Sequence, residues 1–238
     1  MSQLRPDFSS QISKSYHGLR FTWQEFVSLI LELTIIAYQR MKMANVVQAS
    51  WEEDMFTVNL EVCIRNVIFD GNYPIQVQSF KKRITSGMLS GEETIKKSKI
   101  MDLVIYQNWE RDSNEVHFVW EAKRVCDKRV ESSYPNLNSE YVNEAIYRFI
   151  EREYAEGLED AGILGYVLAG EVGNIVDDIN QSMGQLRVNK PLPATNNLRL
   201  APAINQFEDI YESAHIRTDN SSIQLYHLFL TFDFAPSA

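Results

Sequence analysis

Two acidic side chains and one lysine stand inside apolar runs near the middle of the chain, where buried strands ordinarily carry no charge. Asp102 lies in the run IMDLVIYQ, and Glu121 and Lys123 lie in the run NEVHFVWEAKRV, which follows a polar turn. Alternate residues of a strand share a face, so Glu121 and Lys123 are expected to point the same way. A hairpin between the two runs could bring Asp102 opposite them, on the same face.

These residue types suit the hydrolysis of a phosphodiester. Converging carboxylates repel one another and are costly to desolvate, and a hard divalent cation such as Mg2+ removes that repulsion by taking oxygen ligands. A neighbouring ammonium can orient a water molecule, or stabilise charge while a phosphate is attacked. The three side chains therefore match the needs of metal-assisted cleavage of nucleic acid.

The elements that must position these side chains alternate between helices and strands. Three successive strands beside a helix–strand unit imply an α/β fold with a mixed central sheet and helices on both faces. Periodicity, caps and turn residues predict helices over 22–43, from 51 to the turn at 70–74, 139–156 and 172–188, and strands over 74–83, 100–107, 114–125, 162–170, 207–217 and 222–234.

The first predicted helix is apolar nearly all round, and Thr22 with Glu25 forms a capping-box pattern at its start. A helix without a polar face is either deeply buried or covered by a partner. Two alternatives remain open for residues 22–43: burial within the chain, or a contact with a partner protein or a second copy in a homodimer.

The charged pair of runs resembles the signature of a known nuclease superfamily. Asp102, followed by Glu121-Ala122-Lys123, is similar to the Asp…Glu-x-Lys signature of the PD-(D/E)xK, or restriction-endonuclease-like, nucleases. Met101 stands where the name-giving proline of that family would lie.

The resemblance also implies an architecture. The core of that superfamily runs helix, three strands, helix, strand (αβββαβ), and residues 51–170 supply this order. We therefore expect a nuclease-like domain over 51–238, whose C-terminal strands extend the sheet or contact a partner. Residues 1–50 would be an N-terminal arm and an additional helix.

By the same resemblance, Asp102 and Glu121 would ligate Mg2+ or Mn2+, helped by the backbone carbonyl of Ala122. Lys123 would position the attacking water and offset charge at the phosphate. Many members of the superfamily add an acid from the first helix of the core, and Glu53 fits that role as a catalytic residue and metal ligand.

Two alternatives to this role of Glu53 stay open. Glu52, one residue earlier, could supply the acid instead. Glu53 also stands three residues after Ser50, in capping-box spacing, so it could be no more than part of a helix cap that complements the helix dipole.

Binding of a polyanion requires positive charge near the site. Arg124 and Lys128 follow the Glu-x-Lys motif, and Arg148 and Arg152 are four residues apart on the next predicted helix, hence on one face. These four residues are the predicted substrate-binding group. The alternative for Arg148 and Arg152 is that they pair with Glu144, Glu151 or Glu156 on a solvated helix face.

Bulk properties limit the remaining possibilities. The chain has 238 residues and a formal net charge of −9, which argues against a broad basic surface for non-specific nucleic-acid binding but permits a local basic cleft. Two cysteines, no signal-peptide pattern and no long apolar segment favour a cytoplasmic protein without membrane contact. No Walker loop, histidine metal spacing or Ser-His-Asp elbow is visible, and His227 is expected to lie in the core.

The sequence therefore predicts a Mg2+-dependent (or Mn2+-dependent) nuclease that hydrolyses DNA, with RNA as an alternative substrate. Its expected setting is a bacterial antiviral defence or restriction system with a companion protein. The alternatives are a catalytically silent nuclease-fold scaffold, a nucleic-acid-binding subunit of a multiprotein complex, or a toxin neutralised by an antitoxin.

Overall fold

The computed structural model describes residues 21–82, 100–107, 117–155, 157–189 and 196–234, which form an α/β fold around one mixed sheet. The strands are β1 (Ile75–Lys82), β2 (Ile100–Gln107), β3 (His117–Val125), β4 (Asp160–Val167), β5 (Arg199–Leu200), β6 (Ile210–Ile216) and β7 (Ser222–Thr231). They lie in the order β1-β2-β3-β4-β7-β6-β5. The prediction of a mixed sheet is confirmed.

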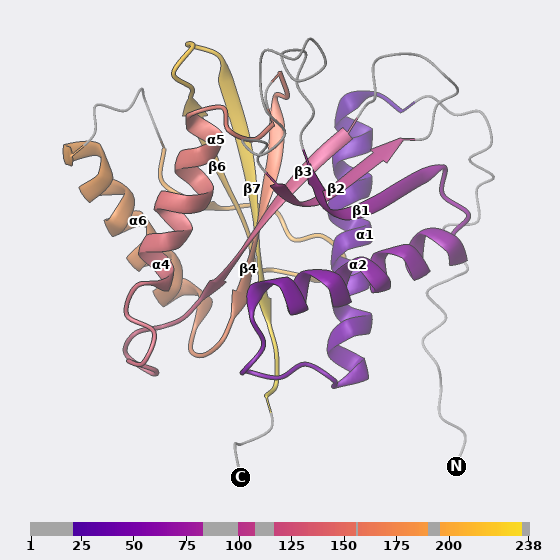
Figure 1. Ribbon diagram of the computed structural model, residues 1–238, viewed down its shortest axis with the longest axis horizontal. Helices are drawn as coiled ribbons and strands as arrows, with labels where there is room; N and C mark the ends of the chain where they lie inside the picture. Colours follow the sequence, from indigo (N-terminus) through magenta and orange to yellow (C-terminus); the bar gives the residue numbers. More distant parts are fainter. Residues whose placement is uncertain (1–20, 83–99, 108–116, 156, 190–195, 235–238) are drawn as a thin grey trace.

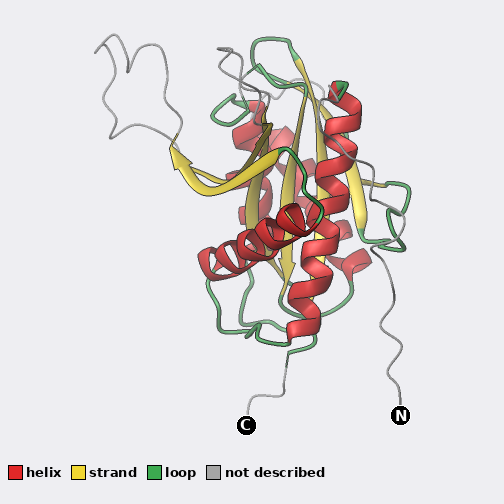
Figure 2. Ribbon diagram, turned by 90° about the vertical axis from the view of Figure 1, so that its right-hand side faces the viewer, coloured by secondary structure: helices red, strands yellow, loops and turns green. Residues whose placement is uncertain are grey.

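Helices cover both faces of this sheet (Figure 1). They are α1 (Trp23–Ala44), α2 (Glu53–Asp70), α4 (Leu137–Glu140), the π-helix η3 (Tyr141–Ile146), α5 (Tyr147–Ile150) and α6 (Val172–Asn189). α1 and α2 share one apolar core with the strands, and η3, α5 and α6 share a second core on the other face. Figure 2 shows α2 lying across α1.

Helix α1 begins as its sequence predicts and is buried within the chain. The Thr22 hydroxyl accepts the N–H of Glu25, and the Glu25 carboxylate accepts the N–H of Thr22, so the capping box is confirmed. Phe26, Leu33 and Ile35 are fully buried against α2 and the sheet. Of the two alternatives for residues 22–43, burial within the chain is therefore the one observed. No helix in the described ranges is long and apolar enough to cross a bilayer.

Helix α2 starts later than its apparent cap predicts. Glu52 occupies the N-cap position without a side-chain capping bond, so the capping box expected between Ser50 and Glu53 is wrong. The Glu53 carboxylate is instead held by Lys123, as described below. The Glu53 side chain forms an ion pair with Lys123 of a distant strand, so it does not form a local helix cap.

The strands next to the charged group pair as the hairpin interpretation requires. β2 and β3 are antiparallel, from Tyr106↔His117 to Leu103↔Trp120, and the turn between them lies outside the described residues. β3 and β4 are parallel, β4 is parallel to β7, and β6 pairs with β7. Of the two roles expected for the C-terminal hairpin, extension of the sheet is the one observed. β4 is buried at every position, as predicted for a central strand.

The helix predicted over 139–156 is shorter and less regular. Helical structure runs from α4 through η3 to α5 and stops at Ile150. Arg152 and Ala155 adopt left-handed backbone angles, with φ of 65° and 51°, which no α-helix can contain. Neither residue is a glycine, so the sequence carried no ordinary stop signal. The two-residue strand β5 was not predicted at all.

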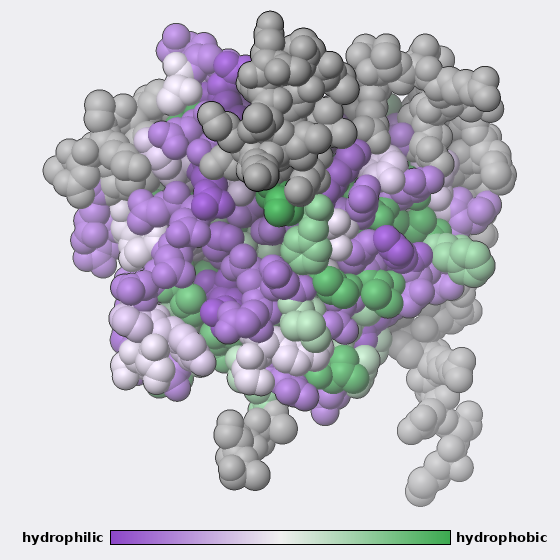
Figure 3. Space-filling view, viewed as in Figure 1, coloured by the Kyte–Doolittle hydropathy of each residue, from purple (hydrophilic) through white to green (hydrophobic). Residues whose placement is uncertain are grey.

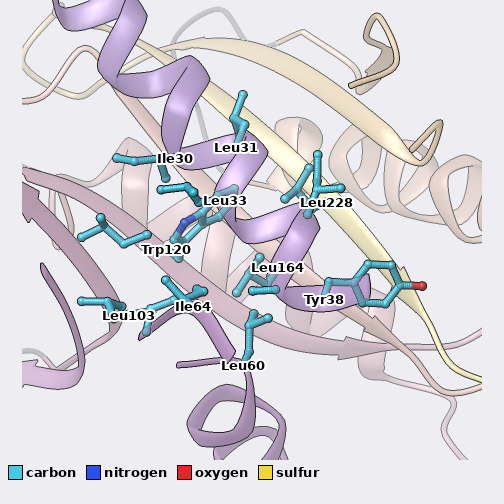
Figure 4. Close-up of a cluster of buried hydrophobic side chains, with 14 of the residues drawn as sticks. Ile30, Leu31, Leu33, Tyr38, Leu60, Ile64, Leu103, Trp120, Leu164 and Leu228 are labelled. Carbon is cyan, nitrogen blue, oxygen red and sulfur yellow. The ribbon is translucent and has the colours of Figure 1, made fainter. Parts of the chain in front are cut away.

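A glycine allows β4 to approach the largest side chain of the core. Gly162 lies beside Trp120, whose ring is fully buried among the side chains of α1 and the sheet (Figure 4). A Cβ at residue 162 would lie 2.1 Å from the Trp120 ring. We expect Gly162→Ala to lower the free energy of unfolding by roughly 1–3 kcal/mol in urea denaturation.

Gly184→Ala is the matched control, because Gly184 lies in the interior of a helix and a Cβ there meets nothing within 4 Å. In α6 this change is expected to raise stability by about 0.5–1 kcal/mol. Equal effects of the two substitutions would contradict the close packing of β4 on Trp120.

Candidate functional site

Four charged side chains from three elements gather around one point between β2, β3 and the start of α2. Lys123 of β3 donates from Nζ to Glu121 Oε1 at 3.1 Å and to Glu53 Oε1 at 2.9 Å. The same ammonium donates to the carbonyl of Ala122 at 2.7 Å. Glu121 and Lys123 thus share a face, as strand alternation predicts, and Glu53 reaches them from the first residue of α2.

Asp102 joins the group through the backbone of the neighbouring strand. Its Oδ2 accepts the N–H of Ala122 at 2.8 Å, just beyond the last β2–β3 pair, Leu103↔Trp120. The N–H of Ala122 therefore donates to the Asp102 carboxylate and not to a backbone carbonyl of a neighbouring strand. At the same level of β1, Phe80 has a left-handed φ of 53°. The sheet is irregular where the carboxylates converge.

Burial controls the ionisation of this group. Glu121 is 1% exposed, and burial, followed by the nearby Asp102 charge, raises its pKa well above the usual value. Burial also raises the pKa values of Asp102 and Glu53, against the opposing effect of Lys123. For Lys123, burial alone would lower the pKa, but the three carboxylates outweigh burial and raise it. The lysine therefore stays an ammonium, and its charge favours ionisation of the three carboxyl groups while their burial opposes it.

The donor set fits a hard divalent cation. Oε2 of Glu121 is buried without a hydrogen-bond partner among the described residues, which is costly unless something else meets it. Carboxylates of Asp102 and Glu121 and the carbonyl of Ala122 are the oxygen ligands that Mg2+ and Mn2+ prefer. No set of three or more acidic, histidine or cysteine side chains converges as a ready cation cage in the part that the structure describes. Glu53 contacts the ammonium of Lys123 instead.

Two of the four predicted substrate-binding residues lie at this site. Arg124 pairs with Glu52 at 2.7 Å, at the start of α2. Arg148 of α5 places Nη1 3.9 Å from Glu121 Oε1 and donates to the Tyr154 hydroxyl at 2.8 Å. Both guanidinium groups therefore border the carboxylates.

The other two predicted substrate-binding residues point elsewhere. Lys128 pairs with Asp178 of α6 at 2.9 Å, and Arg152 pairs with Asp219 at 3.2 Å. Arg152 does not share a helical face with Arg148, because the helix has already ended at Ile150. Helical spacing was the only basis for grouping the two arginines, and the left-handed turn removes it.

The charged group opens to solvent through a small, mainly acidic cleft of about 240 Å³, lined by Glu52, Glu53, Lys123, Arg124, Leu137, Glu140 and Glu144. A larger hollow of about 640 Å³ lies between the other end of α2 and strands β1 and β2. It is lined mostly by apolar and amide side chains, with Arg65 among them, and lacks the Asp, Glu and Lys group. The chemistry therefore identifies the smaller cleft as the candidate site.

Sequence reasoning missed some of the residues that surround the site. Tyr154 accepts the Arg148 hydrogen bond, and burial together with Glu121 raises its pKa to about 12. It follows the irregular end of α5, so no helical spacing could have linked it to the motif. Glu140 and Glu144 line the cleft one turn apart, a spacing that was readable, although Glu144 was considered only as a partner of Arg148.

A second polar cluster lies in the core, away from the cleft. His227 is fully buried and bonds through Nδ1 to the Tyr141 hydroxyl at 2.8 Å and through Nε2 to the Ser213 hydroxyl at 2.8 Å. The same Ser213 hydroxyl lies 2.7 Å from Nε2 of His215. These residues satisfy one another in the core, which confirms the expectation for His227.

The burial of His227 predicts a loss of stability in acid. Burial holds its pKa well below the usual 6.5, so the unfolded chain binds a proton that the folded chain does not. The stability that His227 contributes is present at neutral pH and is lost as pH falls below about 6.5. We expect His227→Gln to be less stable than the native chain at pH 7.5, with the difference shrinking by pH 5. A difference that stays constant in urea denaturation across this range would contradict the prediction.

Known proteins give no family assignment for this site. No protein-family model, curated protein or solved structure matches the chain. The interpretation of the cleft therefore rests on its own residues: the buried carboxylate of Glu121, a lysine held between acids, and a carboxylate oxygen with no hydrogen-bond partner among the residues that the structure describes.

Proposed function

We propose that the chain is a metal-dependent nuclease of the PD-(D/E)xK type that hydrolyses the phosphodiester bonds of DNA. The observation that carries the proposal is that Asp102, Glu121, Lys123 and Glu53 come together from three elements at the base of one cleft. Burying the charged groups of Glu121 and Lys123 costs stability, and such groups cluster at functional sites. The order α2, β1, β2, β3, helix, β4 also agrees with the core of that superfamily.

Each side chain has a role that its contacts support. Bound Mg2+ would supply Lewis acidity and lower the pKa of a water molecule. Asp102 is oriented by the Ala122 N–H, and Glu121 offers Oε2, which has no hydrogen-bond partner in the described part of the chain. Lys123, with its raised pKa, donates hydrogen bonds to the attacking water or to a phosphate oxygen and does not act as a base. Hydrolysis joins the water oxygen to phosphorus, and the bridging oxygen leaves with a proton.

One observation favours a second candidate, a catalytically silent scaffold. Lys128 and Arg152 are paired within the chain, and the cleft is lined by four glutamates, which would repel a polyanion. In a scaffold the ammonium of Lys123 would be the permanent counter-ion of the site. The two candidates differ in a measurable way, because only the nuclease cleaves.

The test is cleavage by the purified chain. Linear DNA, circular DNA and RNA are each incubated with Mg2+, with Mn2+ and with EDTA, and Asp102→Asn is run alongside. We expect metal-dependent cleavage of DNA that EDTA and Asp102→Asn abolish. Cleavage of RNA alone would mean that the substrate is RNA and not DNA. No cleavage in any condition would favour the scaffold.

Arg148 and Arg152 provide a matched pair for the substrate-binding role. Arg148 lies beside Glu121, whereas Arg152 pairs with Asp219, outside the cleft lining. A lost charged contact costs about 1.5–3 kcal/mol, so Arg148→Ala is expected to lower kcat/KM for DNA about 10- to 100-fold. Arg152→Ala should change kcat/KM less than about threefold. Similar losses in both variants would contradict a specific role for Arg148.

A further inference from the structure

The outer face of α2 carries an exposed apolar stripe. Met55 is 48% exposed, Val58 39%, Val62 52% and Phe69 85%. The opposite face of the same helix is buried in the core. Figure 3 shows apolar side chains gathered over the segment where α2 lies. Apolar side chains that form one contiguous exposed patch mark interaction surfaces, whereas single exposed ones do not.

The spacing of the stripe indicates what covers it. Met55, Val62 and Phe69 are each seven residues apart, so they stand nearly above one another along the helix. Val62 is the midpoint, with an apolar residue at equal distance on either side. An antiparallel pair of α2 helices related by a two-fold axis at Val62 would place Val62 against its own copy and Met55 against Phe69 of the other copy. Such a self-complementary patch is what an isologous contact requires.

The charges at the ends of α2 permit this register. In the antiparallel pair, Asp54 falls opposite Asp70 of the other copy. Asp70 is already neutralised by Arg40 at 2.6 Å, so two unpaired carboxylates do not meet. Met43 at the C-terminal end of α1 and Val46 just after it are further exposed apolar side chains, on the stretch of chain that leads into α2. A stable dimer needs a contact wider than one helix stripe, and this end of α1 extends it.

We propose that two copies of this chain form a two-fold dimer through the outer face of α2, centred on Val62. This contact replaces the one that the sequence predicted through α1, and it does not depend on the nuclease activity. Glu53 is the first residue of α2, so the two clefts lie near opposite ends of the helix pair. With 18 residues in α2, the two Glu53 residues would be about 27 Å apart along the axis.

The first test is the mass of the chain in solution. The single chain has a mass of 27.5 kDa, and light scattering on a size-exclusion column is expected to give twice this value. Val62→Asp should restore the mass of one chain without lowering the melting temperature, because the side chain is exposed. Val130→Asp, at a 65%-exposed valine in the loop after β3, is the control and should stay dimeric.

The second test locates the two-fold axis. In a Cys63→Ala background, Val62→Cys is expected to form an intermolecular disulfide under mild oxidation, because residues on the axis face their own copies. Val130→Cys in the same background should not cross-link. A monomeric native chain would overturn the proposal and would mean that a different protein covers α2. A dimer that survives Val62→Asp, or fails to cross-link at residue 62, would overturn it as well.

Discussion

Replacing Lys123 with methionine is expected to lower the rate of metal-dependent DNA cleavage by roughly 10²- to 10³-fold, the effect of removing one preorganised charge from a phosphoryl or acyl transfer site. Methionine keeps much of the lysine stem but removes the ammonium that contacts Glu121, Glu53 and the Ala122 carbonyl. The measurement is a single-turnover rate at saturating enzyme, which isolates the chemical step from DNA binding.

The control for this substitution is Lys128→Met. Lys128 follows the same strand but pairs with Asp178 of α6. Its replacement by methionine is therefore expected to change the cleavage rate less than about threefold. Loss of the ammonium also leaves buried acids without their counter-ion, which can cost about 3–5 kcal/mol. The melting temperature of each variant therefore has to be measured first, and the rates compared where both are folded. A folded Lys123→Met variant that cleaves DNA at the native rate would remove Lys123 from the mechanism.

Local sequence pattern was sufficient to predict the positions of some of the site residues. Strand alternation placed Glu121 and Lys123 on one face, and the length of the hairpin placed Asp102 beside them, because both depend only on neighbouring residues. Glu53 was harder to assign, because whether it caps a helix or meets Lys123 depends on where α2 crosses the sheet. Tertiary packing decided between two local interpretations that the sequence supported equally.

Where the structure departs from the sequence-based expectations, the physical reasons can be named. Arg152 was grouped with Arg148 because a helix was assumed to continue, and two non-glycine residues in left-handed conformations end it. Hydrophobic pattern alone also left open whether α1 is buried or covered by a partner. A helix that is apolar all round, such as α1, is the one that the core can bury completely, whereas α2 has enough apolar residues for both the core and the surface.

Glu121→Gln is expected to separate stability from activity. Glutamine has the shape of glutamate without its charge, so it removes a buried carboxylate whose pKa burial and Asp102 raise well above 4.5. The unfolded chain ionises Glu121 more readily than the folded chain does, so native stability falls as pH rises above about 4.5. The variant escapes this penalty and should exceed the native chain by roughly 0.5–2 kcal/mol at pH 8, and by less at pH 5. Cleavage should nevertheless be lost.

Asp160→Asn is the matched control, because Asp160 is another buried carboxylate, 4% exposed, outside the cleft. Its Oδ2 accepts the indole N–H of Trp23 at 2.5 Å. The hydrogen bond from Trp23 is stronger when its acceptor is charged. The asparagine variant is therefore expected to lose about 1–3 kcal/mol of the free energy of unfolding. Opposite signs of the two stability changes would distinguish a carboxylate kept for chemistry from one kept for structure.

A bound divalent cation would contact the same carboxylate oxygen atoms, those of Glu121 and Asp102. A cation that binds only the folded chain adds about 2.7 kcal/mol at a concentration 100 times its dissociation constant. We expect Mn2+ to raise the melting temperature of the native chain and to leave that of Glu121→Gln unchanged, since the variant lacks one of the two carboxylates proposed to bind the cation. A variant that is stabilised by Mn2+ as much as the native chain would place the cation elsewhere. A native chain that Mn2+ leaves unchanged would mean that Lys123 alone neutralises these acids, as a silent scaffold requires.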